Sequence, residues 1–365
     1  MELSLLDATL REGEQRSGRS YSVDQKVAAA RKLDDLGLDM IQVGFPVAED
    51  GTKEVCERLD TDAKIAGIAR AIESDIDAAA DAGVDVIQFS IPSSDLQREH
   101  LIGVSREELK EMAVSTLNYA RDTGQEVHFG TMDGFRTDPE YLNELMEAID
   151  TPYFGISDTV GARKPGEVVD FLEQLDGDLS RISVHFHRDL GVGTANVLAA
   201  AECGVGKADV TVGGIGERVG NVSFEEVVVS GSLGSSPIDF SIEVDNLVSE
   251  CKEILDILGE DIPPNKPILG ELAYEHESGM HTSAMLDDPD TFQAFEPARF
   301  GGERRLLFGP SSGKGSSQRL LEQAGIEDPS SAQVSNLLDR LHGFDEHVSL
   351  ERALELAREE ANSNR

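Results

Sequence analysis

The chain has 365 residues, 39% of them hydrophobic, and its 70 Asp and Glu against 32 Lys and Arg give a net charge of −38. This charge disfavours direct binding of nucleic acid, whose phosphates need basic patches, and no apolar run approaches the ~20 residues of a membrane span. The first residues lack a basic segment followed by an apolar one, so no signal peptide is expected. Three widely spaced cysteines predict free thiols in a reducing cytoplasm.

The acidic residues are spread over predicted helix faces rather than gathered in blocks. A nucleic-acid mimic or an acidic interaction tail concentrates its charge in one segment. A dispersed acidic surface on an ordinary core is typical of a protein in high salt, where screening removes most of the self-repulsion. We therefore expect a halophilic source.

In chain order, eight runs rich in β-branched residues predict strands at 3–10, 39–45, 63–69, 84–90, 126–132, 153–158, 182–187 and 208–214. Amphipathic segments such as 22–37, 72–83 and 105–124 predict helices between them, and each of these ends in Gly, the residue that favours a left-handed cap. Strands that alternate with helices predict a parallel sheet. Eight such units fit an α/β fold with a closed (β/α)8 TIM barrel, and a doubly wound open sheet is the alternative.

The alternation ends after Gly234, where connectors bearing Pro, Gly and Ser surround one predicted helix at 244–259. The sequence after about residue 271 is mostly helical in pattern. We therefore predict a catalytic barrel over 1–235, a linker with one helix over 236–270 and a mostly helical C-terminal accessory domain over 271–365.

Candidate functional residues follow the predicted strand ends, where barrels of this type carry their chemistry. They are Asp7, Arg11, Glu12 and Gln15 after the first strand, Asp158 and Thr159 after the sixth, His185 and His187 on the seventh, and Glu217, Arg218 and Asn221 after the eighth.

Side chains alternate along a strand, so the two histidines project to the same side. Two imidazoles and a carboxylate suit a catalytic divalent metal. The alternative to a metal site is that both histidines are ordinary buried or solvated residues. An Arg, a carboxylate and an Asn are expected at the carboxyl ends of the same barrel, and this convergence favours the metal site.

Three motifs carry a resemblance to a known family: "TLREGEQ" (9–15), "HFHRDLGVGTAN" (185–196) and "GGIGERVGN" (213–221). In that order and spacing they resemble the 2-isopropylmalate, homocitrate and citramalate synthases, which are metal-dependent TIM-barrel condensing enzymes. The resemblance continues into "HESGMHTSA" (276–284) and "ERRLLFGPSSGKGSS" (303–317) of the accessory domain.

The resemblance implies a divalent metal (Mn²⁺, Mg²⁺ or Zn²⁺) and acetyl-CoA as co-substrate. It implies metal binding by Glu12, His185, His187 and, at longer range, Asn221; substrate binding by Arg11, Gln15 and Thr159; and catalysis by Arg11, Glu217 and His281. Arg11 would polarise the keto oxygen of a 2-oxo acid. His281 would come from the partner in a homodimer, and neither nucleic acid nor a membrane is an expected partner.

The chain departs from the family pattern at three positions. Met132 stands where the fifth strand usually carries Glu, Phe292 stands where a Tyr is common, and Arg188 replaces the Asn of "HNDLG". The first two changes remove polar groups from the expected site, which indicates either a different substrate pocket or altered condensation. Asp133 or His128 would be the compensating group, and an ordinary structural role for His128 is the alternative.

The expected reaction is condensation of acetyl-CoA with a 2-oxo acid, best matched by 2-oxoisovalerate to give 2-isopropylmalate for leucine biosynthesis. Homocitrate or citramalate synthesis is the alternative, although His128 and Gly130, in place of the Arg and Ser of one homocitrate branch, argue against a long dicarboxylate. Two alternatives come from other functional classes: a carbon–carbon lyase like hydroxymethylglutaryl-CoA lyase, and a non-catalytic paralogue. The chain ends too early for the C-terminal regulatory domain of leucine-inhibited isopropylmalate synthases, so we expect no leucine feedback through such a domain.

Overall fold

The computed structural model describes residues 1–234 and 237–363. The chain divides into two compact units, the first formed by 1–243 and 250–262, the second by 244–249 and 263–365. The predicted boundary between barrel and linker, at 235–236, lies outside the described residues. Most of the predicted linker helix belongs to the first unit, because Lys32 of the barrel pairs with both Glu250 and Glu253 of that helix.

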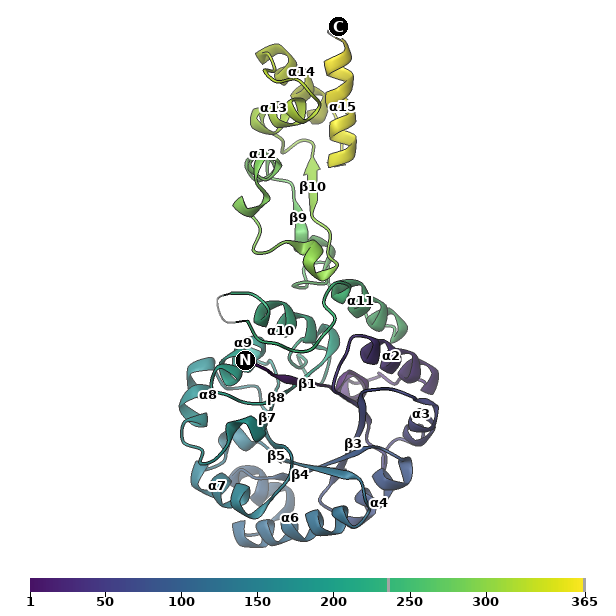
Figure 1. Ribbon diagram of the computed structural model, residues 1–365, viewed down its shortest axis with the longest axis vertical. Coiled ribbons are helices and arrows are strands. Elements are labelled where there is room, and N and C mark those ends of the chain that lie inside the picture. The colour runs from purple at the N-terminus through teal and green to yellow at the C-terminus, as the bar shows by residue number, and fades with distance from the viewer. Residues whose placement is uncertain (235–236, 364–365) are drawn as a thin grey trace. The chain divides into compact units, whose positions relative to one another are not determined.

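Eight parallel strands of the first unit form a closed barrel in chain order (Figure 1). They are β1 (Ser4–Asp7), β2 (Met40–Gly44), β3 (Lys64–Arg70), β4 (Val86–Pro92), β5 (Glu126–Met132), β6 (Phe154–Asp158), β7 (Ile182–Phe186) and β8 (Lys207–Val210). Closure is made by the pairing of β1 with β8, where Ser4 lies opposite Lys207. The predicted (β/α)8 barrel is thus confirmed, and the open sheet is excluded.

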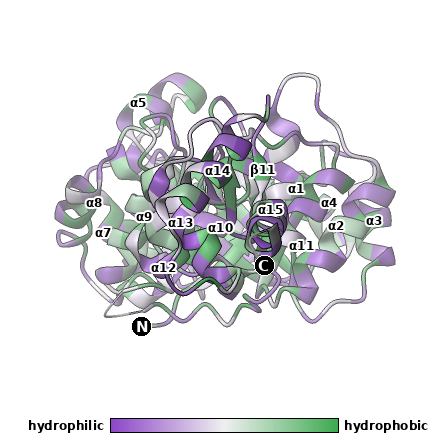
Figure 2. Cartoon of the chain, turned by 90° about the horizontal axis from the view of Figure 1, so that it is seen from above, coloured by the Kyte–Doolittle hydropathy of each residue, from purple (hydrophilic) through white to green (hydrophobic). Residues whose placement is uncertain are grey.

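Helices surround the strands, as Figure 1 shows. They are α1 (Thr9–Glu12), α2 (Val23–Asp35), α3 (Thr52–Arg58), α4 (Glu73–Ala82), α5 (Asp95–Gln97), α6 (Arg106–Arg121), α7 (Pro139–Ala148), α8 (Pro165–Leu172), α9 (Gly193–Glu202), α10 (Phe224–Gly231) and α11 (Leu247–Ile257). Ser22 and Ser105 close capping boxes that begin α2 and α6. Hydrophilic and hydrophobic residues share the surface of helices such as α3 and α8, as expected for amphipathic segments (Figure 2).

The predicted first strand, 3–10, is longer than the observed β1, which stops at Asp7. The carboxylate of Asp7 accepts hydrogen bonds from the backbone N–H of Thr9 at 2.9 Å and from its hydroxyl at 2.7 Å. This local bonding turns the chain out of the sheet. The helix α1 that follows carries Arg11 and Glu12 over the carboxyl ends of the strands.

The barrel interior contains both apolar and polar groups. Strands β1 to β4, with the residue that follows β1, contribute a small apolar cluster, which consists of Leu6, Ala8, Met40, Ala66 and Val86. Strands β5 and β8 contribute His128 and Lys207 to the lining of a cavity, and Tyr153, next to β6, joins them. The two groups meet where the Lys207 ammonium lies 3.5 Å from the sulfur of Met40.

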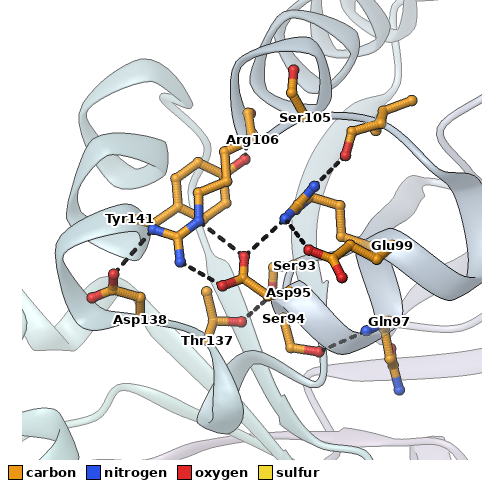
Figure 3. A network of polar contacts seen from close by, with 12 residues as sticks. Ser93, Ser94, Asp95, Gln97, Glu99, Ser105, Arg106, Thr137, Asp138 and Tyr141 are labelled. Atoms are coloured by element: carbon orange, nitrogen blue, oxygen red, sulfur yellow. Dashed lines mark hydrogen bonds and ion pairs between the residues drawn. The ribbon is translucent and has the colours of Figure 1, made fainter.

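A polar network fixes the loop after β4 to the start of α6 and α7 (Figure 3). Asp95 accepts hydrogen bonds from the guanidinium groups of Arg106, at 2.8 and 3.0 Å, and of Arg98, at 3.0 Å. These bonds, those from Arg106 first, lower the pKa of Asp95 to about 2. Arg106 also pairs with Asp138 at 3.0 Å, and its carbonyl accepts a hydrogen bond from the hydroxyl of Tyr141. The network holds one part of the barrel rim in place.

The second unit contains α12 (Gly279–Asp287), α13 (Lys314–Gln323), α14 (Ser331–His342) and α15 (Leu350–Ser363). They pack around a buried core that includes Phe308, Leu320, Leu337 and Leu341. A three-stranded sheet runs through the unit in the order β11 (Val348–Ser349), β10 (Arg305–Phe308), β9 (Glu275–His276). The mostly helical character was predicted. The sheet was not, because strands of two to four residues are too short to show an alternating pattern.

No helix in the described part of the chain is both long and apolar enough to span a membrane. Cys56, Cys203 and Cys251 all belong to described residues and form no disulfide.

Candidate active site

A cavity of about 380 Å³ is lined by residues from the carboxyl ends and the interior of the barrel. Among the residues expected from the sequence, it is lined by Arg11, Glu12, Gln15, Thr159, His185, His187 and Glu217. Strand ends far apart in the chain thus meet in one place, as the barrel geometry predicts.

Glu12, His185 and His187 lie together at this cavity. One potential ligand atom from each of the three side chains lies within 4.8 Å of the other two. Nε2 of His185 is 3.5 Å from a carboxylate oxygen of Glu12. Glu12 is 1% exposed and His187 is 6% exposed, so water competes little for these donors.

Asp209 on β8 orients His185, and it was not among the residues expected from the sequence. Its carboxylate lies 3.0 Å from Nδ1 of His185, so the proton on Nδ1 points at Asp209 while Nε2 faces Glu12. A carboxylate behind a histidine fixes the tautomer in this way at many metal sites. The alternation along β8, which puts Lys207 and Asp209 on the same side as the cavity, was the signal that could have found it.

Burial and neighbouring charges keep Glu12 and His187 in the protonation states that bind metals. Burial lowers the pKa of His187 to about 3, with a further contribution from His185, so its ring is neutral near pH 7. Burial acts to raise the pKa of Glu12, but Arg11, His185 and His187 outweigh it and hold that pKa below its usual value. A neutral imidazole and an ionised carboxylate are the required ligand forms.

The donor set fits a divalent transition metal. Two imidazoles with one carboxylate, and further positions open, suit Zn²⁺, Mn²⁺ or Fe²⁺. Within the described structure, Nδ1 of His187 and Oδ1 of Asn221 are buried atoms with no hydrogen-bond partner. Buried polar atoms are rarely left without a partner, and a bound ion with its water is one way to satisfy them.

Arg11 lies beside the triad and is held in place from both sides. Its Nη1 pairs with Glu12, and its Nε donates to the amide oxygen of Gln42 at 2.5 Å. With its amide turned to face complementary partners, Gln15 donates to Glu12 at 3.1 Å and accepts from Arg11 at 3.3 Å. The guanidinium is only 11% exposed, so it presents a positioned positive charge at the cavity.

Thr159 and Glu217 lie on the rim. Thr159 follows β6, and its hydroxyl accepts a hydrogen bond from the backbone N–H of Asp133 at 2.8 Å. Glu217, in the loop after β8, is 49% exposed and pairs with Arg218 at 3.1 Å. Asp133 is fully engaged with Arg136 and Ser94, so it is not free to replace the carboxylate absent at Met132.

Asn221 and Arg188 belong to the loop that closes the β8 side. The amide nitrogen of Asn221 is 3.3 Å from Nε2 of His185. Arg188 donates from Nε to the carbonyl of Val219 at 2.9 Å and from its backbone N–H to the carbonyl of Gly220 at 3.1 Å. The unusual arginine of this motif thus holds the loop that presents Asn221.

Three further residues named from the sequence take other positions. Met132, at the end of β5, lines the cavity and is 36% exposed. His281 lies on α12 of the second unit, where its ring stacks on Phe292 with centroids 3.9 Å apart. His128 is a buried interior residue that bonds Glu126 at 2.7 Å.

Family models match both parts of the chain. An "HMGL-like" model matches residues 2–249, and a "Homocitrate synthase post-HMGL domain-like" model matches residues 268–347.

Three relatives from Methanopyrus kandleri bear the names of three different synthases. The one named "Probable 2-isopropylmalate synthase" is 39% identical over 88% of this chain and 66% of its own length. "Homocitrate synthase AksA" is 37% identical over 93% and 87%, and a relative assigned provisionally to (R)-citramalate synthesis is 36% identical over 93% and 68%. The chain spans about two thirds of the length of the first of these relatives.

A solved structure of an HMG-CoA lyase from Bacillus subtilis has a TM-score of 0.64 to this chain, at 20% identity, over 72% of this chain and 95% of that one. At this identity the likeness concerns the fold alone. The family models, the relatives and the fold agree with the motifs at the barrel mouth, and the chain belongs to the HMGL-like family, among the relatives named 2-isopropylmalate, citramalate and homocitrate synthases.

Proposed function

We propose that this protein condenses acetyl-CoA with a 2-oxo acid and releases CoA, in a reaction that depends on a divalent metal. The observation that carries the proposal is the meeting of Glu12, His185 and His187 beside Arg11 in one cavity. A cation held there would act as a Lewis acid on the keto oxygen of the substrate.

Arg11 supplies the fixed positive charge for this reaction. Attack on the keto carbon moves the carbonyl electron pair onto oxygen, and the developing alkoxide is stabilised by a positive group that is already in place. Gln42 and Glu12 position the guanidinium before the substrate arrives. Thr159 and Gln15 line the space next to it and are proposed to contact the carboxylate end of the acid.

A base must remove a proton from the methyl group of acetyl-CoA. We assign this role to the carboxylate of Glu217, which lines the cavity. The resulting carbanion forms the carbon–carbon bond, the alkoxide takes up a proton, and water then cleaves the thioester to give CoA and a second carboxylate.

The relatives make 2-oxoisovalerate the first acid to test, with 2-isopropylmalate as product. Synthases named for three different acids lie within 36–39% identity of this chain. Overall identity therefore does not choose between 2-oxoisovalerate, pyruvate and 2-oxoglutarate, and the choice depends on the cavity itself.

We further propose that the working form is a homodimer in which His281 of one chain completes the site of the other. The support is the match of residues 268–347 to a domain that accompanies barrels of this family.

The test is CoA release in high-salt buffer with Mn²⁺, Mg²⁺ or Zn²⁺. Acetyl-CoA is offered with 2-oxoisovalerate, pyruvate, 2-oxoglutarate or oxaloacetate in turn. We expect release with one acid, loss of release after chelation of the metal, and a fall in kcat of at least about 10³-fold in His185→Ala. His100→Ala, an exposed histidine outside the cavity, is the matched control and should retain full activity.

Absence of CoA release with every acid, from protein shown to bind metal, would overturn the condensation. Cleavage of 3-hydroxy-3-methylglutaryl-CoA by the same preparation would then assign the site to a lyase.

A further inference from the structure

Lys207 is a buried cation at the inner end of the cavity. It is the first residue of β8, is 1% exposed and lines the same cavity as the triad. Burial lowers its pKa, against the effect of Asp209 and Glu126, to about 8, so the side chain is mostly an ammonium near pH 7. A buried ammonium is costly unless it is paired.

The contacts of this ammonium are all with neutral groups. Nζ lies 3.4 Å from Nδ1 of His128, 3.5 Å from the sulfur of Met40 and 4.7 Å from the ring centroid of Tyr153. Burial and the charge of Lys207 lower the pKa of His128 to about 4, so that ring is neutral. Among the described residues, Lys207 makes no ion pair within 4.0 Å.

The two acidic residues with the largest effect on Lys207, Asp209 and Glu126, each bond other groups. Asp209 accepts a hydrogen bond from His185 at 3.0 Å. Glu126 bonds Nε2 of His128 at 2.7 Å and Nζ of Lys64 at 2.6 Å. Among the described residues, these carboxylates thus act on Lys207 at longer range, and none of them forms an ion pair with it within 4.0 Å.

Small side chains line part of the cavity that this ammonium shares with the triad. Ser90, Gly130, Gly155, Ser157 and Ser183 line the cavity on four adjacent strands. Lys207 precedes Asp209 by two residues on β8, which corresponds to about 6.6 Å along a strand. A substrate held at the triad can thus extend its far end toward the ammonium in the same cavity.

Further polar side chains line the cavity that Lys207 shares with the triad. Gln42 and Gln88 form a hydrogen bond to each other and line the cavity together with His128 and Lys207. An isopropyl group placed beside the ammonium would shield it from water without supplying a hydrogen bond, which is unfavourable.

We propose that the 2-oxo acid substrate carries a second anionic group, a carboxylate at its far end, which Lys207 binds. This inference rests on the proposed function and makes a short 2-oxo diacid, such as 2-oxoglutarate, the substrate class in place of 2-oxoisovalerate. The second carboxylate gives Lys207 an ion pair in direct contact and selects against neutral side chains, because those would leave the ammonium without one.

Lys207→Met tests the proposal, because it removes the charge and keeps an unbranched side chain. The KM for 2-oxoglutarate in the CoA-release assay should rise by about 10- to 100-fold, the effect of losing a hydrogen bond to a charged group. The change in kcat should be smaller, and the ratio of kcat/KM for 2-oxoisovalerate to that for 2-oxoglutarate should increase. Lys207→Arg should restore part of the diacid preference.

Lys64→Met is the matched control, since Lys64 also bonds Glu126 but does not line the cavity. It should leave the KM for 2-oxoglutarate unchanged. Thermal unfolding should show Lys207→Met folded, with a Tm at or above that of the wild type, because a desolvated charge is replaced by an apolar side chain.

Preference of the wild type for 2-oxoisovalerate or pyruvate, or an unchanged KM in Lys207→Met, would overturn this inference while leaving the condensation in place. Calorimetric binding of 2-oxoglutarate to the metal-loaded protein, without acetyl-CoA, separates the two proposals. Binding that Lys207→Met weakens, without CoA release from any acid, would support the anionic subsite and reject the condensation.

Discussion

Asp7 lies at the end of β1 with 0% exposure and accepts both of its hydrogen bonds from Thr9. The hydroxyl of Thr9 in turn accepts from the backbone N–H of Val212 at 2.8 Å, which joins the end of β1 to the loop after β8. Burial raises the pKa of Asp7 to about 7, despite the opposing effect of these hydrogen bonds. The protein therefore carries an acid that ionises only near neutral pH at the seam where its barrel closes.

This raised pKa makes a testable contribution to stability. The folded protein holds the Asp7 proton between its unfolded pKa of 3.8 and its folded pKa of about 7, so the free energy of unfolding falls as pH rises through this window. Below pH 3.8 the contribution of Asp7 to the free energy of unfolding is constant. Above about pH 7 the free energy of unfolding is lower by the full effect of the shifted pKa, up to about 4 kcal/mol. Asp7→Asn lacks the proton, so its free energy of unfolding relative to wild type should increase between about pH 4 and pH 7.

Chemical denaturation at several pH values checks this expectation. Asp60→Asn, which alters an exposed carboxylate, serves as the control and should differ from wild type by a constant amount. A difference for Asp7→Asn that is flat across the same range would show that Asp7 is ionised throughout.

At the scale of elements, the loop 213–221 after β8 depends on glycine. Gly220 has φ +99°, and a Cβ built there would lie 2.0 Å from the carbonyl oxygen of Gly214. Gly216 has φ +152°, and its Cβ would lie 2.4 Å from Oδ1 of Asn221. Both contacts are far too close for a real side chain, so these glycines let the loop fold over the triad and present Asn221.

Gly220→Ala should therefore damage the site as well as the fold. We expect a loss of about 1–3 kcal/mol in the free energy of unfolding from the left-handed backbone and the clash. We also expect metal affinity to fall by about 10- to 100-fold, because the displaced loop no longer supports the ligands. Metal titration followed by calorimetry measures the second effect.

Gly83→Ala is the control for this prediction. Gly83 ends α4 with φ +79°, and nothing lies within 4 Å of a Cβ built on it. It should lose about 1 kcal/mol of stability and no metal affinity. Equal metal affinity in both variants would mean that the loop does not position the ligands.

At the scale of the whole molecule, the barrel and the C-terminal unit each have their own core. His281 belongs to the second unit and Glu12 and His185 to the first. In a homodimer, a residue from the partner can complete each site, and the two-fold symmetry then requires both sites to share the arrangement.

Mixing two inactive variants tests whether His281 acts on the partner's barrel. After His185→Ala and His281→Ala are unfolded and refolded together, half of the dimers should be mixed, and one site in each mixed dimer should be intact. About a quarter of the wild-type activity should therefore return in the CoA-release assay. A mixture of His185→Ala with Glu12→Gln should stay inactive, because both changes lie in the barrel. No recovery in the first mixture would place His281 at its own barrel or outside the site.

The sequence by itself determined the barrel and most of the site residues at the carboxyl ends of its strands. Eight strands alternate with helices strongly enough to be placed from local pattern, and a closed parallel barrel brings all carboxyl ends to one face. Once that rule holds, Arg11, Glu12, His185 and His187 meet because each follows or ends a strand. The strand that ends early at Asp7 was missed, because a side-chain hydrogen bond to the backbone overrides the apolar pattern.

Only the tertiary structure decided which residues meet inside the barrel. The role of Asp209 behind His185 and the contact between Lys207 and His128 depend on the register with which β5, β7 and β8 face one interior. From the sequence, His128 in place of an Arg indicated that the substrate is not a long dicarboxylate. The structure shows that Lys207, from another strand, brings a positive charge next to His128. A local pattern fixes which face a side chain takes, but closure of the barrel fixes its neighbours, and the charge of a buried group depends on those neighbours.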